Sequence, residues 1–248
     1  MFLQKSVIGR NSVVSSIVRS DHRTADVFRK YGIEYCCGGK WPLETVCLTK
    51  GIEFDQLKKE LEDVCRVIQL PPAISFSNWN TDFLTGYIVN VHHQYLKKTM
   101  TDTGEIIKQF ADSHVKQYPH MQEVFALFQQ LKMEILPHIQ YEEETIFPYI
   151  CQIAHAHDNN DTYAKLLVKT LRKPLDVIMK HEEDVLSALV LKIRIATNSY
   201  IAPENACVSQ LLALSRLEEL DNDLMQHIYL ENEILFPRAL KIEAELLR

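Results

Sequence analysis

Two stretches of the chain repeat one pattern of residues that could bind metal ions. Residues 138–148 read HIQYEEETIFP and residues 227–237 read HIYLENEILFP, with six of the eleven positions identical. Each copy contains a histidine followed four residues later by a glutamate, namely His138 with Glu142 and His227 with Glu231. On an α-helix, residues four apart project to the same side. Each pair could therefore bind one metal centre.

Two further histidines belong to the same repeat. The copies lie 89 residues apart, and the same 89 residues separate His92 from His181, each of which precedes its His-x-x-x-Glu by 46 residues. We therefore expect four helices to direct six ligands to a common centre: His92, His138, Glu142, His181, His227 and Glu231. If both glutamates bridge two ions, each ion receives two imidazole nitrogens and two carboxylate oxygens, which leaves positions open for water or small diatomics. Such ligands suit iron and also tolerate manganese or zinc.

The polar residues beside these candidate ligands are expected to have no role in metal binding. Helical geometry predicts that Glu143, Glu144 and Glu233 lie on the solvated face. A single His-x-x-x-Glu on a helix is also common as a surface ion pair, so the repetition carries the metal hypothesis. The remaining histidines have no such pairing and are expected to be solvent-facing or structural: His22, His93, His114, His120, His155 and His157.

The elements that must position these residues are predicted to be helices. Only 7 Gly and 9 Pro occur in 248 residues, which favours an all-α protein over a many-stranded one. Apolar periodicity predicts four long helices that form an antiparallel four-helix bundle in a domain of residues 81–248. These helices are expected at residues 81–110, 121–153, 171–196 and 206–247.

A smaller helical domain is predicted in front of the bundle, at residues 1–70, followed by a linker at residues 71–80. The linker prediction rests on the Pro pair and the Ser and Asn residues of QLPPAISFSNWN. In the front domain, Gly32 is expected to end a helix and Asp55 to cap the start of another. A small domain on a proline-containing linker could also pack on a second copy, so a homodimer is an open prediction.

The front domain carries adjacent cysteines in the sequence CCGGK, at Cys36 and Cys37. Adjacent Cα atoms lie about 3.8 Å apart, whereas disulfides prefer about 5.5–6 Å, so reduced thiols are expected. Lys40 would favour the thiolate form. The pattern indicates a reactive or metal-transferring pair, and the alternative is that both are small buried residues at a helix end.

Charge and hydropathy exclude several partners. The formal charge is −6 and no basic patch is present, so nucleic acid is not an expected partner. No segment approaches the roughly 20 apolar residues of a membrane span, and the start of the chain lacks the apolar region of a signal peptide. A cytoplasmic location without membrane attachment is the expectation.

Four segments resemble the repair of iron centres family, di-iron proteins associated with the recovery of iron–sulfur clusters after nitrosative and oxidative damage. They are FRKYGIEYCCGGK from Phe28, VHHQ from Val91, MKHEED from Met179 and LMQHIYLENEILFPRAL from Leu224. The resemblance implies two non-haem iron ions in a hemerythrin-like bundle, with iron ligands at the same six residues. It also implies damaged iron–sulfur proteins as clients. Lys180 departs from the family pattern, in which an acidic residue often precedes the third-helix histidine.

The resemblance favours repair of iron–sulfur clusters by iron donation, by nitric oxide chemistry at the di-iron site, or by both. Cys36 and Cys37 would serve in transfer to partners, and no classical enzyme activity is implied. Three alternatives stay open: a hemerythrin-like protein that binds or senses O₂ or nitric oxide, a ferroxidase, and a metal-free structural bundle. Ferritin-like bundles use Glu-x-x-His rather than His-x-x-x-Glu, which counts against a ferroxidase.

Overall fold

The computed structural model describes residues 8–36, 39–65 and 75–248 of the chain. These residues form helices and one isolated bridge between Val13 and Pro42, with no strand among them, so the predicted all-α class is confirmed. Contacts divide the chain into two compact units. The first unit contains residues 1–74 and 200–217, and the second contains residues 75–199 and 218–248.

The described residues before residue 66, which belong to the first unit, contain four short helices: α1 (Val14–Ser20), α2 (Thr24–Lys30), α3 (Leu43–Lys50) and α4 (Phe54–Val64). Asp21 separates α1 from α2, and its carboxylate accepts a hydrogen bond from the backbone N–H of Arg23. Gly32 follows α2 with φ of 60°, as expected for a glycine beyond a helix end. The N-cap of α4 is Glu53 rather than the expected Asp55, because the Glu53 carboxylate accepts from the N–H groups of Asp55 and Gln56.

The first unit also contains the start of α12 (Val208–Tyr229). Arg216, which is 7% exposed, forms an ion pair with Asp26 of α2, and Arg19 donates to the carbonyl of Ala206 at 3.1 Å. Residues 200–217 therefore pack with N-terminal helices, whereas the sequence pattern predicts them within the bundle domain. The predicted domain boundaries stay predictions, because residues 66–74 lie outside the described part of the chain.

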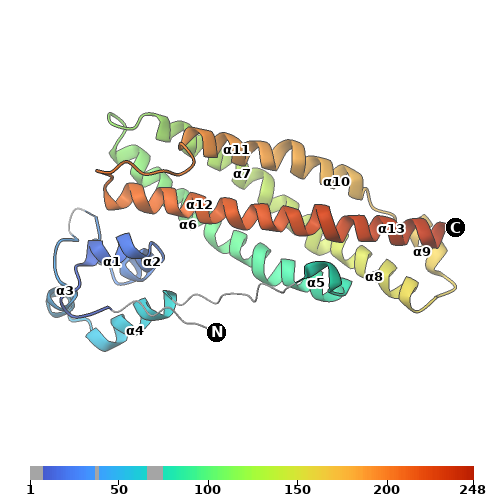
Figure 1. Cartoon of the computed structure of the whole chain (residues 1–248), viewed down its shortest axis with the longest axis horizontal. Helices are drawn as coiled ribbons and strands as arrows, with labels where there is room; N and C mark the ends of the chain where they lie inside the picture. The colour runs from blue at the N-terminus through green and yellow to red at the C-terminus, as the bar shows by residue number, and fades with distance from the viewer. Residues whose placement is uncertain (1–7, 37–38, 66–74) are drawn as a thin grey trace. The chain divides into compact units, whose positions relative to one another are not determined.

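The second unit contains the predicted helical runs, except for the start of the fourth run, and the runs alternate in direction along the chain (Figure 1). Helix α6 packs on α7, α7 packs on α11, and α8 packs on α13. A short 3₁₀ turn, η1 (Phe76–Asn78), precedes the first run, and α9 (Ala164–Leu171) lies between the second and third runs. The α-helices of the four runs are α5 (Thr81–Tyr87) with α6 (Gln94–Ser113), α7 (His120–Tyr141) with α8 (Phe147–Asp158), α10 (Leu175–His181) with α11 (Ser187–Ala196), and α12 with α13 (Phe236–Leu247).

Each of the four runs contains a π-helical segment between its two α-helices. Such segments insert one residue into a helical turn and are frequent at functional sites, because the wider turn changes which side chains face the neighbouring helices. The segments are η2 (Ile88–His93), η3 (Glu142–Ile146), η4 (Glu182–Leu186) and η5 (Leu230–Leu235). They therefore contain or adjoin the residues of the repeated pattern.

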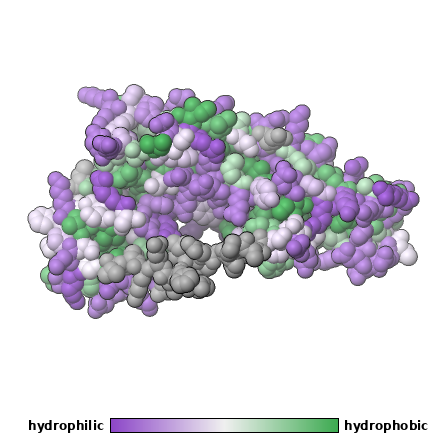
Figure 2. Space-filling view, viewed as in Figure 1, coloured by the Kyte–Doolittle hydropathy of each residue, from purple (hydrophilic) through white to green (hydrophobic). Residues whose placement is uncertain are grey.

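Apolar side chains from all four runs pack around these segments. Ile88, Ile146, Leu175, Leu230 and Phe236 are buried in one cluster. On the face of the molecule drawn in Figure 2, hydrophilic residues alternate with smaller hydrophobic areas. Among the described residues, no helix combines the length and apolar character needed to cross a membrane.

Candidate metal centre

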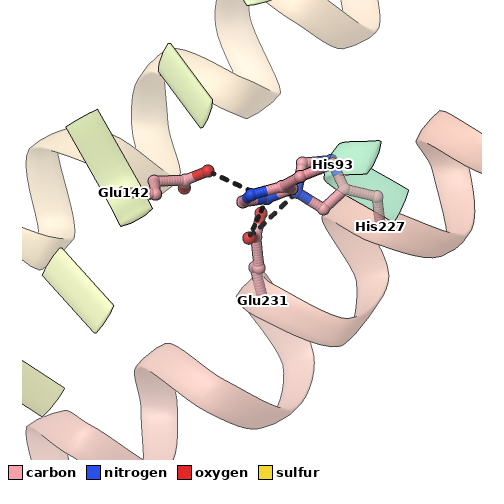
Figure 3. A group of neighbouring side chains, drawn as sticks. All are labelled: His93, Glu142, His227 and Glu231. Atoms are coloured by element: carbon pink, nitrogen blue, oxygen red, sulfur yellow. Dashed lines mark hydrogen bonds and ion pairs between the residues drawn. The ribbon is translucent and has the colours of Figure 1, made fainter. Parts of the chain in front are cut away.

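Four fully buried side chains from three runs converge in the bundle: His93 from η2, Glu142 from η3, and His227 with Glu231 from the fourth run (Figure 3). The Nε2 atoms of His93 and His227 lie 3.0 Å apart. His93 Nε2 also lies 3.5 Å from Glu142 Oε2 and 3.8 Å from Glu231 Oε1, and His227 Nε2 lies 2.9 Å from Glu231 Oε1. The four groups thus present two imidazole nitrogens and two carboxylates to one point.

A second group shares both glutamates of the first. It consists of His138, Glu142, Glu182 and Glu231, which offer ligand atoms within 4.8 Å of one another. His138 Nε2 lies 3.1 Å from Glu142 Oε1 and 3.1 Å from Glu182 Oε1. Two shared carboxylates between two sets of donors give the arrangement expected for a pair of bridged metal ions.

The buried oxygens of this cluster are short of hydrogen-bond donors. Among the described residues, neither carboxylate oxygen of Glu142 or Glu231 has a hydrogen-bond partner of suitable geometry, and the same holds for Glu182 Oε2. A buried acceptor without a donor costs about 1–3 kcal/mol, and more when it is charged. Divalent cations supply the positive charge that these oxygens lack, so the residues present fit a metal centre.

Burial also perturbs the protonation of the cluster when no metal is bound. Burial lowers the pKa of His93 and lowers that of His227 well below its usual range. Burial, together with the charges of Glu142 and Glu182, raises the pKa of Glu231 well above its usual range. For His138, the pKa rises to about 10 because the interactions with Glu142 and Glu182 outweigh the opposing effect of burial. In the metal-free cluster, Glu231 and His138 therefore hold protons that compete with metal binding, whereas His93 and His227 do not.

Two carboxylates bind the outer nitrogens of adjacent histidines. Glu143 Oε1 lies 3.0 Å from His93 Nδ1, and Asp223 Oδ1 lies 2.9 Å from His92 Nδ1. The Glu143 side chain is 22% exposed. Glu143 therefore contacts a buried histidine of the cluster as well as solvent, whereas its helical position predicted a place on the solvated face only.

The structure brings His138, Glu142, His227 and Glu231 together and leaves two predicted ligands outside both groups. His92 is buried and its ring stacks on that of His227 with centroids 6.0 Å apart. His181 lies with its Nε2 3.7 Å from Glu134, and its side chain is 36% exposed. The physical reason is rotation, because one residue along a helix turns a side chain by about 100°. The ligand roles of His92 and His181 stay predictions.

Two residues of the cluster, His93 and Glu182, were not predicted from the sequence. They directly follow His92 and His181, and they are themselves 89 residues apart. The offset of 89 residues therefore applies to both pairs, His92 with His181 and His93 with Glu182, and spacing alone could not distinguish them. His93 was expected to be solvent-facing or structural, and it is fully buried within the cluster instead.

The adjacent cysteines are described only in part. Cys36 is half-buried, and Cys37 lies outside the described residues. Gly39 makes a close backbone approach here, since a Cβ atom at this position would collide with the backbone of Tyr35. The Gly39 carbonyl accepts from the N–H of Ser15 at 2.9 Å. This part of the loop is therefore attached to α1, and the roles of the two cysteines stay predictions.

The bundle holds two buried groups of histidines and carboxylates, and this arrangement places the protein in the class of metal-binding helical bundles. A family model described as the hemerythrin HHE cation-binding domain matches residues 87–239, and a second, described as a domain of unknown function (DUF542), matches residues 10–65. The chain belongs to the hemerythrin HHE cation-binding family. The match to both models also confirms the resemblance to the repair of iron centres family.

Curated relatives cover almost the whole chain. One is the iron-sulfur cluster repair protein ScdA of Staphylococcus epidermidis, 25% identical over 94% of this chain and 100% of its own length. Another is the iron-sulfur cluster repair protein YtfE of Enterobacter sp. strain 638, 29% identical over 93% of this chain and 97% of its own length. A YtfE protein of Escherichia coli O81 is 28% identical with the same coverage.

Proposed function

We propose that the chain binds two non-haem iron ions in the buried cluster of the bundle and acts in the repair of iron–sulfur clusters damaged by nitrosative or oxidative stress. One observation carries this proposal: both carboxylate oxygens of Glu142 and of Glu231, and Oε2 of Glu182, are buried without a hydrogen-bond partner in the described chain. The names of the relatives, which are iron-sulfur cluster repair proteins, support the choice of function.

The four residues common to the sequence pattern and the structure would hold the ions: His138, Glu142, His227 and Glu231. His93 and Glu182 complete the two groups, and His92 and His181 are the other candidates. When bound, the iron supplies ions for cluster rebuilding and a centre for nitric oxide chemistry. The surrounding residues keep water away from the ligands, because both shared glutamates are fully buried.

Damaged iron–sulfur proteins would be the clients, and nitric oxide and O₂ the small molecules that meet the centre. Cys36 and Cys37 would serve in transfer of metal to a client, since thiolates are metal ligands as well as nucleophiles. A cytoplasmic location, which the sequence predicts, and a homodimer, which the sequence leaves open, are part of this proposal.

The test compares a variant of the cluster with a matched surface variant. The double change His227→Ala with Glu231→Ala removes one imidazole and one shared carboxylate, whereas His155→Ala with Glu233→Ala removes the same residue types from exposed positions. Protein purified without added metal is expected to contain about two irons per chain in the wild type and the surface variant, and far less in the cluster variant.

The same three proteins are then added to a cluster-containing enzyme that nitric oxide has inactivated. Only the wild type and the surface variant are expected to restore its activity. Equal restoration by the cluster variant would exclude the metal centre from the repair function. Iron binding without any restoration, together with a reversible optical change on oxygenation, would instead identify an O₂- or nitric-oxide-binding protein.

A further inference from the structure

Glu143 forms a chain of charged contacts that ends at the metal centre. Its Oε1 atom accepts from His93 Nδ1 at 3.0 Å, and its two oxygens lie 2.8 and 2.6 Å from Lys97 Nζ. Glu143 directly follows the shared ligand candidate Glu142 within the π-helical segment η3. Glu142 therefore faces the centre, and the next residue, Glu143, contacts the side of His93 that points away from the centre.

The two ring nitrogens of His93 contact different groups. Nε2 faces His227, Glu142 and Glu231, and Nδ1 faces Glu143. An ionised carboxylate can only accept a hydrogen bond, so the neutral His93 ring carries its proton on Nδ1. The Nε2 lone pair is then available to a metal ion. Phe147 restricts the ring further, since the two rings stack with centroids 5.5 Å apart.

We propose that Glu143, held by Lys97, is a positioning residue for the metal centre: it fixes the tautomer and orientation of His93. The proposal rests on the proposed function, because it needs a metal ion at the cluster. A carboxylate on the outer N–H of a metal-binding histidine orients the ring and increases the basicity of the nitrogen that binds the metal.

Lys97 is needed because Glu143 is not held by burial. Glu143 and Phe147 line a surface pocket of about 490 Å³, together with polar residues that include Asp82 and Asn90. A glutamate beside such a pocket can rotate into solvent, and rotation would release His93 Nδ1. The Lys97 ammonium contacts both carboxylate oxygens, which favours the conformation that reaches the histidine.

The sequence repeat indicates that the contact between a carboxylate and a histidine, Glu143 with His93, occurs in only one of the two copies. At the offset of 89 residues, His93 corresponds to Glu182 and Glu143 corresponds to Asn232. A carboxylate at position 182 has no N–H to donate and requires no carboxylate partner. The acidic residue thus occurs in the half of the repeat that has the histidine, and a neutral amide occurs in the half that lacks it.

The test uses Glu143→Gln, which keeps the side-chain length but removes the charge. Glu144→Gln is the matched control, because it changes an exposed glutamate of the same segment and alters the net charge equally. Lys97→Met should act in the same direction as Glu143→Gln, and Lys97→Arg should restore wild-type behaviour. Iron(II) retention is measured against a competing chelator, and the visible spectrum is recorded with cobalt(II) in place of iron.

We expect Glu143→Gln to weaken metal retention by about 10-fold to 100-fold and to change the cobalt spectrum, with Glu144→Gln equal to the wild type. Unfolding of the metal-free proteins is measured in parallel. Retention equal to that of Glu144→Gln would overturn the proposal. So would weaker retention with an unchanged cobalt spectrum and a less stable metal-free protein, because that result would indicate a structural role only. Failure of the wild type to bind iron would instead contradict the proposed function.

Discussion

Replacing Glu231 by methionine should abolish the metal centre and yet stabilise the metal-free protein. Glu231 is fully buried and neither of its oxygens has a hydrogen-bond partner among the described residues. Its neighbour His227 offers no compensating charge, because burial lowers the pKa of that imidazole. Methionine is unbranched, similar in size and apolar, so it can occupy the space without a cavity.

The magnitude follows from the unsatisfied carboxylate. An unpaired buried acceptor costs about 1–3 kcal/mol, so Glu231→Met should raise the free energy of unfolding of the metal-free protein by about that amount. For a chain of this size, 1 kcal/mol shifts Tm by about 2–4 °C, which gives an increase of about 2–12 °C. In the presence of iron the order reverses, because only the wild type gains binding free energy on folding.

The effect should depend on pH with a defined sign. The folded-state pKa of Glu231 is raised, so the folded protein binds this proton more tightly than the unfolded chain does. Its contribution to stability is fully present below the unfolded value of about 4.3, and it is lost as pH rises through the raised pKa. The advantage of Glu231→Met should therefore be greatest at neutral pH and smallest in acid.

The assay is thermal unfolding in the presence of a chelator, followed by far-ultraviolet circular dichroism at several pH values. Glu233→Met is the control, since Glu233 is an exposed glutamate of the same segment η5. The control should change stability by no more than about 0.5 kcal/mol. A metal-free Glu231→Met protein that is less stable than the wild type at neutral pH would refute the reasoning, because the carboxylate would then be satisfied without metal.

Other predictions concern the choice of ligands and the end of the bundle. His93→Ala should lower the iron content far more than His92→Ala, measured by metal analysis, and equal losses would contradict the assignment of His93. An iron loss in His181→Ala as large as that in His93→Ala would confirm His181 as a ligand. Tyr149→Phe should destabilise the protein by about 1–3 kcal/mol in chemical denaturation, because the hydroxyl donates to the buried Glu243 at 2.6 Å. An unchanged denaturation midpoint would exclude that contribution.

The long helices could be predicted from the sequence because their apolar residues recur with the helical period and their ends contain strong breakers. The predicted run at residues 121–153 corresponds to continuous helix from His120 to Asp158, and the run at 206–247 corresponds to Val208–Leu247. The packing of residues 200–217 with the first unit could not be predicted in this way. That contact involves Arg216 and Asp26, which are 190 residues apart and belong to no repeat.

The site could be predicted in part for a related reason. Spacing of four residues within a helix identified His138 with Glu142 and His227 with Glu231 without reference to other helices. The choice between His92 and His93 depends on how the first run is rotated against the others. That rotation is affected by the π-helical segment η2, which the apolar period of 3.6 residues does not reveal.

The two metal positions that we propose for the cluster should differ in how firmly they hold iron. The first group offers two imidazoles and two carboxylates, whereas the second offers one imidazole and three carboxylates, because Glu182 occupies the repeat position of His93. Oxygen-rich sites favour magnesium, calcium and manganese, and imidazole favours iron and zinc. We therefore expect a chelator to remove one of the two irons faster than the other, with His93→Ala affecting the slower phase. Removal of both irons in a single phase would show that the repeat makes the two positions equivalent, and that Glu182 is no ligand.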